Sequence, residues 1–134
     1  MSITVGPIVY DTSFTVFPQD TNYNVPPCIF GGKMLAEMDN AAAMVSRRAL
    51  YGTLCTDAVT VSVNVEFLRP AYLGEIVVIN AVLVAVGTKS LDIHVNCYRE
   101  DRSSGENQKM AQGTFRFVSR QNGNPIAHNL KFGA

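Results

Sequence analysis

Asp39 has the surroundings of a carboxylate that could act as a general base. It falls in a segment whose apolar residues recur at helical spacing, and its neighbours three and four positions away are Leu35, Ala36, Ala42 and Ala43. No basic residue on its own helix can therefore pair with it. Such a carboxylate either meets a partner from elsewhere in the fold or is partly desolvated, and desolvation raises its pKa toward the range of a general base. A solvated aspartate on a half-exposed rim is the alternative.

A glycine pair, Gly31-Gly32, stands at the start of the same segment. Unpaired N–H groups at a helix start carry the positive end of the helix dipole, and they can polarise a carbonyl and hold the oxyanion that follows. Plain turn chemistry is the other interpretation of a glycine pair. Eight residues of helix span about 12 Å, so Gly31 and Asp39 of the same helix cannot easily contact the same substrate carbonyl. Two antiparallel copies across a twofold axis would bring them together, which predicts a composite site between subunits.

Three polar residues could assist this chemistry. Ser46, seven residues after Asp39 and on the same side of the helix, could hydrogen-bond a carboxylate or a water, or bond to its own helix backbone. Asn22 and Asn24 precede the helix in a proline-containing loop, where an amide could orient a water or a substrate oxygen or could serve turn geometry. Glu37 has Lys33 four residues earlier, which predicts a solvated ion pair and no chemistry.

The elements that must position these residues are one helix and one sheet. Helical spacing predicts a helix over 33–50, and period-two alternation or apolar runs predict strands over 13–17, 59–67, 76–86, 91–98 and 110–118. We expect the 59–67 strand to bury one face and the 76–86 strand to bury both. The four strands after the helix are expected in short meander connections. The predicted fold class is α+β, an antiparallel sheet wrapped around one long central helix.

Composition limits the classes of partner. A chain of 134 residues predicts a single domain over 1–134. Eleven Lys and Arg balance eleven Asp and Glu, so no net field draws the chain to nucleic acid or to an anionic membrane. Charged residues make up 16%, against roughly 25% in an average soluble domain. That shortage leaves apolar surface for another subunit to cover.

Neither a membrane nor a metal is predicted. The longest apolar run falls short of the roughly 18–20 residues that a membrane helix needs, and the first ten residues show no signal peptide. We therefore expect a cytoplasmic protein without a membrane partner. Cys28, Cys55 and Cys97 are an odd number without close pairing, which indicates reduced, structurally buried thiols and offers no metal-binding spacing.

Four short segments carry a family resemblance. At Asp20-Thr21-Asn22, Ile29-Phe30-Gly31-Gly32, Met38-Asp39 and Phe67-Leu68-Arg69-Pro70, the sequence resembles the hotdog-fold acyl-CoA thioesterases, most closely the short bacterial acyl-CoA hydrolase type. The likeness extends over 16–118. It implies a homodimer whose two sheets join, and higher assemblies such as a tetramer or a hexamer. It also implies hydrolysis of an acyl-CoA thioester to free acid and CoA without a metal or cofactor, CoA being part of the substrate.

The resemblance also implies roles for single residues. Asp39 matches the family's helix carboxylate, which acts as base or nucleophile, and Gly31 or Gly32 matches the amide that faces the thioester carbonyl. The family's loop asparagine corresponds to Asn22 when counted from Asp20-Thr21 and to Asn24 when counted back from the helix, because the loop is shorter in the family. We favour Asn22, since loop length varies more readily than a local motif.

A second set of residues resembles positions near CoA. Arg69, Lys89 and Ser90 resemble positions near the pantetheine and the phosphates, although an Arg-Pro corner and a polar hairpin turn serve structure equally well. Two other functions are considered: a non-catalytic hotdog module that binds acyl-CoA, and a hotdog hydratase or dehydratase. The latter enzymes use a catalytic histidine, and neither His94 nor His128 lies near the helix start.

Overall fold

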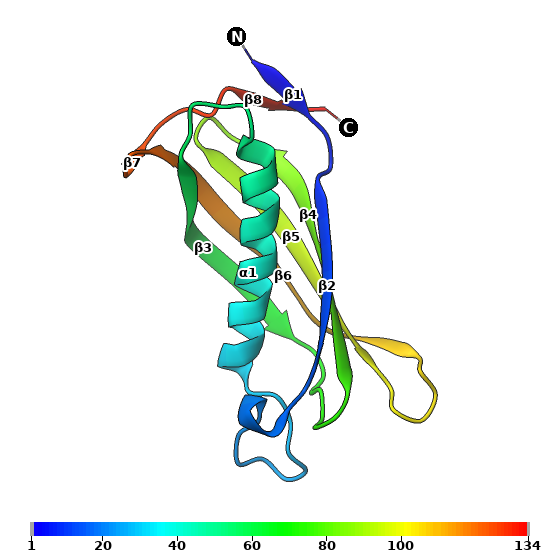
Figure 1. Ribbon diagram of the computed structural model, residues 1–134. Coiled ribbons are helices and arrows are strands. Elements are labelled where there is room, and N and C mark those ends of the chain that lie inside the picture. The colour runs from blue at the N-terminus through cyan, green and yellow to red at the C-terminus, as the bar shows by residue number, and fades with distance from the viewer. Residues whose placement is uncertain (1, 134) are drawn as a thin grey trace.

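One long helix lies against a curled antiparallel sheet in the computed structural model, which describes residues 2–133 (Figure 1). In chain order the elements are β1 (Ile3–Val5), β2 (Val9–Thr15), the short 3₁₀ helix η1 (Pro18–Asp20), α1 (Gly31–Leu50), β3 (Asp57–Phe67), β4 (Ile76–Val86), β5 (Ser90–Glu100), β6 (Asn107–Gln121), β7 (Asn124–Pro125) and β8 (Leu130–Phe132). The order β2-β4-β5-β6-β3 forms the main sheet, and β7 pairs with β6. A parallel pair of β1 and β8 lies at one end of it.

The helix packs one stripe of side chains into the concave face of the sheet. Its buried apolar residues are Met34, Met38, Ala41, Ala42, Val45, Ala49 and Leu50. They meet the inward residues of the central strands: Val77, Ile79, Ala81 and Leu83 of β4, Leu91, Ile93, Val95 and Cys97 of β5, and Met110, Ala111, Phe115 and Phe117 of β6. The predicted α+β class, with a sheet wrapped around a central helix, is confirmed.

The helix begins earlier than the apolar spacing predicts. Gly31 and Gly32 are themselves its first residues, and Phe30 is the N-cap residue, with extended backbone at φ −82° and ψ 150°. The chain leaves the helix at Tyr51 and turns at Gly52, whose φ of 83° lies in the left-handed region that glycine tolerates. The glycine pair is therefore inside the helix, with its N–H groups at the open end.

The order of the strands differs from the predicted meander. β3 does not pair with the next strand in sequence; it lies at the edge of the sheet beside β6, while β4 pairs with β2 and β5. The 68–75 connection must therefore cross the end of the sheet, next to the start of α1 (Figure 1). Periodicity identified the strands, but it holds no information about which strands are neighbours.

Two burial predictions need correction. β4 buries only one face, because alternate residues such as Val78 and Val82 stay half-exposed on the side that the helix does not cover. β3 is mostly exposed, as expected of an edge strand, and Val61 and Val63 are 54% and 43% exposed.

β2 also begins at Val9, earlier than predicted, and the short strands β1, β7 and β8 were not predicted.

A β-bulge interrupts the alternation of β3. Thr60 pairs with Phe117 and Ser62 with Arg116, so Val61 is an extra residue without a partner on β6. Because paired residues point to the same face and Phe117 is buried, Thr60 points inward. Uninterrupted alternation would have placed Thr60 on the same face as Ser62. The bulge therefore turns the Thr60 hydroxyl toward the helix.

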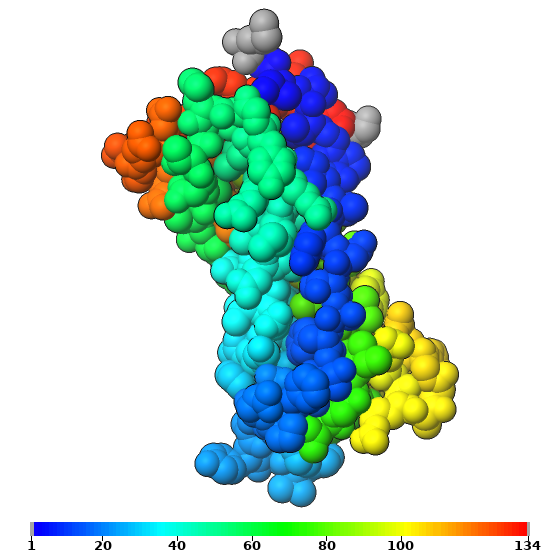
Figure 2. All heavy atoms as spheres, in the orientation of Figure 1, coloured from blue at the N-terminus to red at the C-terminus, as the bar shows by residue number. Residues whose placement is uncertain are grey.

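One face of α1 remains open between β2 and β3 in the protomer, as Figure 2 shows. Exposed apolar side chains lie on the helix, on the connection that follows it and on the adjoining β3: Met44, Tyr51, Leu54, Val61, Val63 and Phe67. Exposed apolar residues that gather in one region of a protein surface mark interaction sites. Within residues 2–133, no helix has the length and apolarity needed to cross a membrane.

Candidate functional site

Asp39 receives a hydrogen bond from another element of the fold. The Thr60 hydroxyl on β3 donates to Oδ1 of Asp39 at 2.7 Å, and the carboxylate is half-buried on α1. No lysine or arginine of the described residues forms an ion pair with it. The sequence left three environments open for this carboxylate: a partner from elsewhere in the fold, partial desolvation, or a solvated rim. The structure shows a partner from elsewhere in the fold, Thr60. Sequence reasoning did not single out Thr60, because uninterrupted alternation with the apolar Val59, Val61 and Val63 places it on the polar face of the strand.

The first turn of α1 presents free backbone donors. Phe30 makes no side-chain cap, and the first turn contains no acidic residue. Within the described residues, the Gly31 and Gly32 N–H groups have no hydrogen-bond partner. A Cβ built on Gly32 would come within 3.0 Å of the Phe30 ring, whereas one on Gly31 would lie 3.7 Å from the Phe67 ring. A side chain at Gly32 would therefore require the Phe30 ring to shift, whereas position 31 has room for a Cβ.

An apolar pocket of about 370 Å³ adjoins Gly31. Its lining residues are Ile29, Gly31, Met34, Phe67, Leu68, Arg69, Pro70 and Met110. They come from the segment before the helix, from the helix itself, from the end of β3, from the 68–75 connection and from β6. A substrate whose carbonyl reaches the Gly31 amide therefore has an apolar surface beside it.

The loop before the helix uses its two asparagines differently. Oδ1 of Asn22 accepts the Asn24 N–H at 3.1 Å, which closes a local turn. Nδ2 of Asn24 donates to Sγ of Cys28 at 3.2 Å. Nδ2 of Asn22 has no partner among residues 2–133. Both side chains belong to exposed residues; among the described residues the Asn22 amide keeps both N–H donors free, whereas the Asn24 amide uses one of its two on Cys28.

Ser46 is bonded to its own helix. The residue is 3% exposed, and its hydroxyl donates to the Ala43 carbonyl at 2.8 Å. It also lines a second pocket of about 300 Å³, together with Tyr51, Cys55 and Asp57 at the C-terminal end of α1 and the start of β3. Within the protomer, the hydroxyl has no direct contact with Asp39.

The three candidate CoA residues are not brought together in one chain. Arg69 follows the end of β3, and its guanidinium donates to the Lys109 carbonyl at 2.8 Å. Lys89 and Ser90 lie at the other end of the sheet, because Ser90 pairs with Val118, which in turn pairs with Val59 near the start of β3. A single protomer therefore offers these groups at opposite ends.

The remaining residues named from the sequence are the Lys33–Glu37 pair and the three cysteines. Lys33 pairs with Glu37 at 3.0 Å, as predicted, and with Asp20 at 3.7 Å. The hydrogen bond with Glu37 raises the pKa of Lys33. The three cysteines are free thiols, two of them buried and Cys55 half-buried. The described residues contain no group of three His, Cys, Asp or Glu placed to hold a metal ion.

Known proteins share this sequence pattern and this fold. The family model described as the thioesterase superfamily matches residues 28–106. YciA of Escherichia coli strain K12, an acyl-CoA thioester hydrolase, is 32% identical over 105 residues, which cover 76% of this chain and 76% of YciA. YkhA of Bacillus subtilis, named an uncharacterized acyl-CoA thioester hydrolase, is 31% identical over 113 residues, which cover 83% of this chain and 62% of YkhA. The chain thus spans less than two thirds of the length of YkhA.

A solved structure agrees over nearly the whole chain. The acyl-CoA hydrolase of Staphylococcus aureus, in complex with butyryl coenzyme A, coenzyme A and coenzyme A disulfide, has a TM-score of 0.84 at 25% identity and covers 98% of this chain and 80% of its own. Variants of that enzyme with an aspartate or a threonine replaced by alanine have been characterised as well. The resemblance to hotdog-fold acyl-CoA thioesterases is thereby confirmed, and the chain belongs to the thioesterase superfamily.

Proposed function

We propose that the protein hydrolyses an acyl-CoA thioester to free acid and CoA, with Asp39 as base or nucleophile and the Gly31 amide as oxyanion donor. The observation that carries the proposal is the Asp39 carboxylate, held by Thr60 at 2.7 Å on a helix whose N-terminal amides are free. The names of the relatives support the reaction. The aspartate and threonine variants of the S. aureus enzyme match this pair in residue type.

The proposed site needs two copies of the chain. Gly31 and Asp39 are about 12 Å apart along one helix axis, too far to act on one carbonyl. β3 is an edge strand with a free side, and the adjoining face of α1 is open. A second copy that continues the sheet antiparallel across β3 places the two helices side by side in opposite directions. A homodimer is therefore the smallest active unit, and a tetramer or hexamer would repeat it.

The reaction can follow two routes. In the first, Asp39 takes a proton from a water, whose oxygen attacks the thioester carbonyl carbon while the Gly31 N–H of the other copy stabilises the oxyanion. The C–S bond then breaks, and CoA leaves as the thiolate. In the second, Asp39 attacks the carbonyl carbon itself, CoA thiolate leaves, and water hydrolyses the resulting anhydride. Thr60 occupies Oδ1, which leaves Oδ2 of Asp39 for either role.

The same dimer explains the separated CoA residues. An antiparallel copy brings the Arg69 end of one protomer toward the Lys89 and Ser90 end of the other. Arg69 and Lys89 then supply positive charge for phosphates from two chains, although the net charge of each chain is zero. Ser46 and the pocket that it lines would face the partner's loop, which carries Asn22 and Asn24. This scheme uses no metal and no cofactor.

Release of free thiol from a panel of acyl-CoAs with short, long and aromatic acyl groups tests the proposal. Asp39→Ala and Asp39→Asn should remain folded and associated, with hydrolysis reduced by orders of magnitude, about 10³-fold. Glu37→Gln on the same helix is the matched control and should keep wild-type turnover. Turnover at the wild-type level in Asp39→Ala would remove Asp39 from catalysis. Binding without turnover across the panel would instead indicate a non-catalytic acyl-CoA-binding module.

A further inference from the structure

The 68–75 connection is tied to the segment that leads into α1. The Ile29 N–H donates to the Ala71 carbonyl at 2.8 Å, and the Leu73 N–H donates to the Pro27 carbonyl at 3.1 Å. These two bonds run antiparallel, with a bridge between Cys28 and Tyr72. Ile29 is two residues before Gly31, so the position of the connection determines where the helix and its first amides begin.

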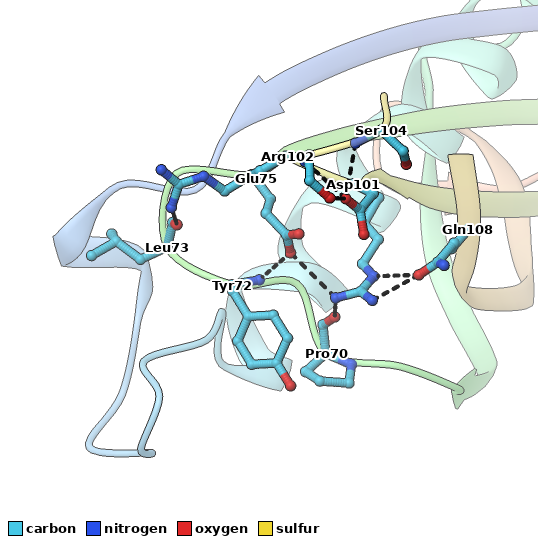
Figure 3. A network of polar contacts seen from close by, with 10 residues as sticks. Pro70, Tyr72, Leu73, Glu75, Asp101, Arg102, Ser104 and Gln108 are labelled. Atoms are coloured by element: carbon cyan, nitrogen blue, oxygen red, sulfur yellow. Dashed lines mark hydrogen bonds and ion pairs between the residues drawn. The ribbon is translucent and has the colours of Figure 1, made fainter. Parts of the chain in front are cut away.

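An ion pair between the buried Glu75 and the largely buried Arg99 holds the other side of the same connection. Oε1 of Glu75 accepts the Tyr72 N–H at 2.7 Å and also Nη1 of Arg99 at 3.4 Å (Figure 3). Nη1 of Arg99 donates in addition to the Pro70 carbonyl at 3.2 Å. The side chains of Arg99 and Glu75 are only 16% and 6% exposed. The pair therefore fixes the connection at Pro70, at Tyr72 and at Glu75 itself.

The guanidinium is anchored in turn to the sheet. Nε and Nη2 of Arg99 both donate to Oε1 of Gln108, at 3.0 and 2.7 Å, and Gln108 is the neighbour of Arg99 on β6. The Tyr72 ring lies 5.5 Å from Cζ of Arg99. Arg99 thus joins two rigid strands to an irregular connection through the planar arrangement of its N–H groups. A lysine in its place would carry the same charge but could not reach these acceptors together.

We propose that Arg99 and Glu75 are a positioning pair that holds the start of α1 through the 68–75 connection, so that the Gly31 amide reaches the reacting carbonyl. The inference rests on the proposed function. Stability alone does not account for the pair, because desolvation offsets much of the attraction between buried charges, and apolar side chains of similar size often stabilise a protein as well. Apolar residues cannot supply the directed hydrogen bonds that link β5, which carries Arg99, to β6 and to the 68–75 connection.

Arg99→Lys is the informative substitution, because it keeps the charge and removes the planar donor set. It should lower kcat about 10- to 100-fold, as a displacement of the amide by a fraction of an ångström to an ångström does, and should leave KM within about twofold. Glu75→Gln keeps an oxygen for the Tyr72 N–H and for Arg99, so its kcat should fall less than that of Glu75→Ala. This pair of Glu75 variants separates the charge from the geometry.

Arg116→Lys provides the matched control. Arg116 also joins two strands, with Nε and Nη2 at 2.8 and 3.0 Å from the carboxylate oxygens of Asp92, but its side chain is 55% exposed and does not contact the 68–75 connection. Its kinetics should match those of the wild type. Amide hydrogen exchange over residues 27–33 is measured in the same variants without substrate, so it does not depend on turnover.

The proposal expects faster exchange over 27–33 together with a lower kcat in Arg99→Lys, and neither change in Arg116→Lys. Equal exchange in the two variants, or an unchanged kcat in Arg99→Lys, would overturn it. Faster exchange throughout the chain would also overturn it, since that result indicates a general loss of stability. A wild-type protein without turnover would contradict the proposed function, while the exchange comparison would still decide whether Arg99 holds this segment.

Discussion

The Thr60 hydroxyl donates a 2.7 Å hydrogen bond to Oδ1 of Asp39, which joins an edge strand to the centre of the long helix. The two residues are 21 positions apart, and the bulge at Val61 allows Thr60 to face inward while the rest of β3 keeps its pairing with β6. The bond fixes the rotation of the carboxylate. It therefore leaves Oδ2 as the carboxylate oxygen that does not accept this bond.

Loss of this hydrogen bond should reduce catalysis without unfolding the protein. Thr60→Val keeps the shape of the side chain but leaves Oδ1 of Asp39 without its donor, which costs about 1–3 kcal/mol for a charged group in a partly buried place. We expect kcat to fall about 10- to 100-fold, with KM nearly unchanged. Thr60→Ser, which keeps the hydroxyl, should retain most of the activity in the same thiol-release assay.

Thr114→Val is the control for a strand threonine away from the site, because the Thr114 hydroxyl lies 3.4 Å from Nδ1 of His94 and does not contact Asp39. Its activity should equal that of the wild type. Full activity in Thr60→Val would show that Asp39 does not depend on this bond.

Mixed dimers test whether the site is shared between copies. Gly31→Pro removes the N–H donor, and proline suits both the first position of a helix and the extended backbone of Phe30 before it. Asp39→Ala and Gly31→Pro should each be inactive alone. The two variants are unfolded together in equal amounts and refolded, so about half of the dimers are mixed. Each mixed dimer has one of its two sites with both groups intact. About one quarter of the wild-type activity should therefore return.

The mixture distinguishes the two arrangements sharply. If the site lay within one chain, every chain in the mixture would lack one of the two groups, and no activity would return. Size-exclusion chromatography of the separate variants shows whether each still associates, so a failure of assembly is not mistaken for a failure of complementation.

The two loop asparagines are separated by single substitutions. Asn22 has free donors, whereas Nδ2 of Asn24 is bonded to Cys28. We therefore expect Asn22→Ala to lower kcat about tenfold or more, and Asn24→Ala to stay near the wild type. Asn22→Asp keeps the oxygen that accepts the Asn24 N–H but loses the amide donors, so it should be as impaired as the alanine variant. The reverse order of effects would assign the role to Asn24.

Alkaline pH should destabilise the fold through Cys97. Burial raises the pKa of this thiol from the ordinary 9.0 to about 12. Between these values the unfolded chain loses a proton that the folded chain keeps, so the free energy of unfolding falls as pH rises, by at most about 1.4 kcal/mol per pH unit. Below pH 9 the full stability is present. Denaturant unfolding between pH 8 and 10.5 measures the slope.

Cys97→Ala should remove this part of the slope, whereas Cys55→Ala, at a half-buried thiol, should retain it. Parallel slopes in the wild type and Cys97→Ala would show that the thiol ionises equally in both states. Because Lys and Tyr residues titrate in the same range, the difference between variants is the meaningful quantity.

The features that could be predicted from the sequence are those set by residues close together in the chain. Helical spacing identified α1 and showed that Asp39 has no basic neighbour on that helix. Alternation identified the long strands. Thr60 was missed because a bulge changes which face a side chain occupies, and the pairing with β6 that produces it is set by tertiary contacts. The position of β3 at the edge was missed for the same reason. Arg99 has partners on the 68–75 connection and on β6, a combination that no local pattern contains.

The open face of α1 has a consequence for how the reaction rate depends on concentration. If different copies supply Asp39 and the Gly31 amide, as proposed, a separated protomer contains no working site. Below the dissociation constant of the pair, the number of sites then rises with the square of the protomer concentration, and dilution alone inactivates the enzyme. An acyl-CoA that bridges both copies binds only the associated form, so substrate itself would protect activity against dilution.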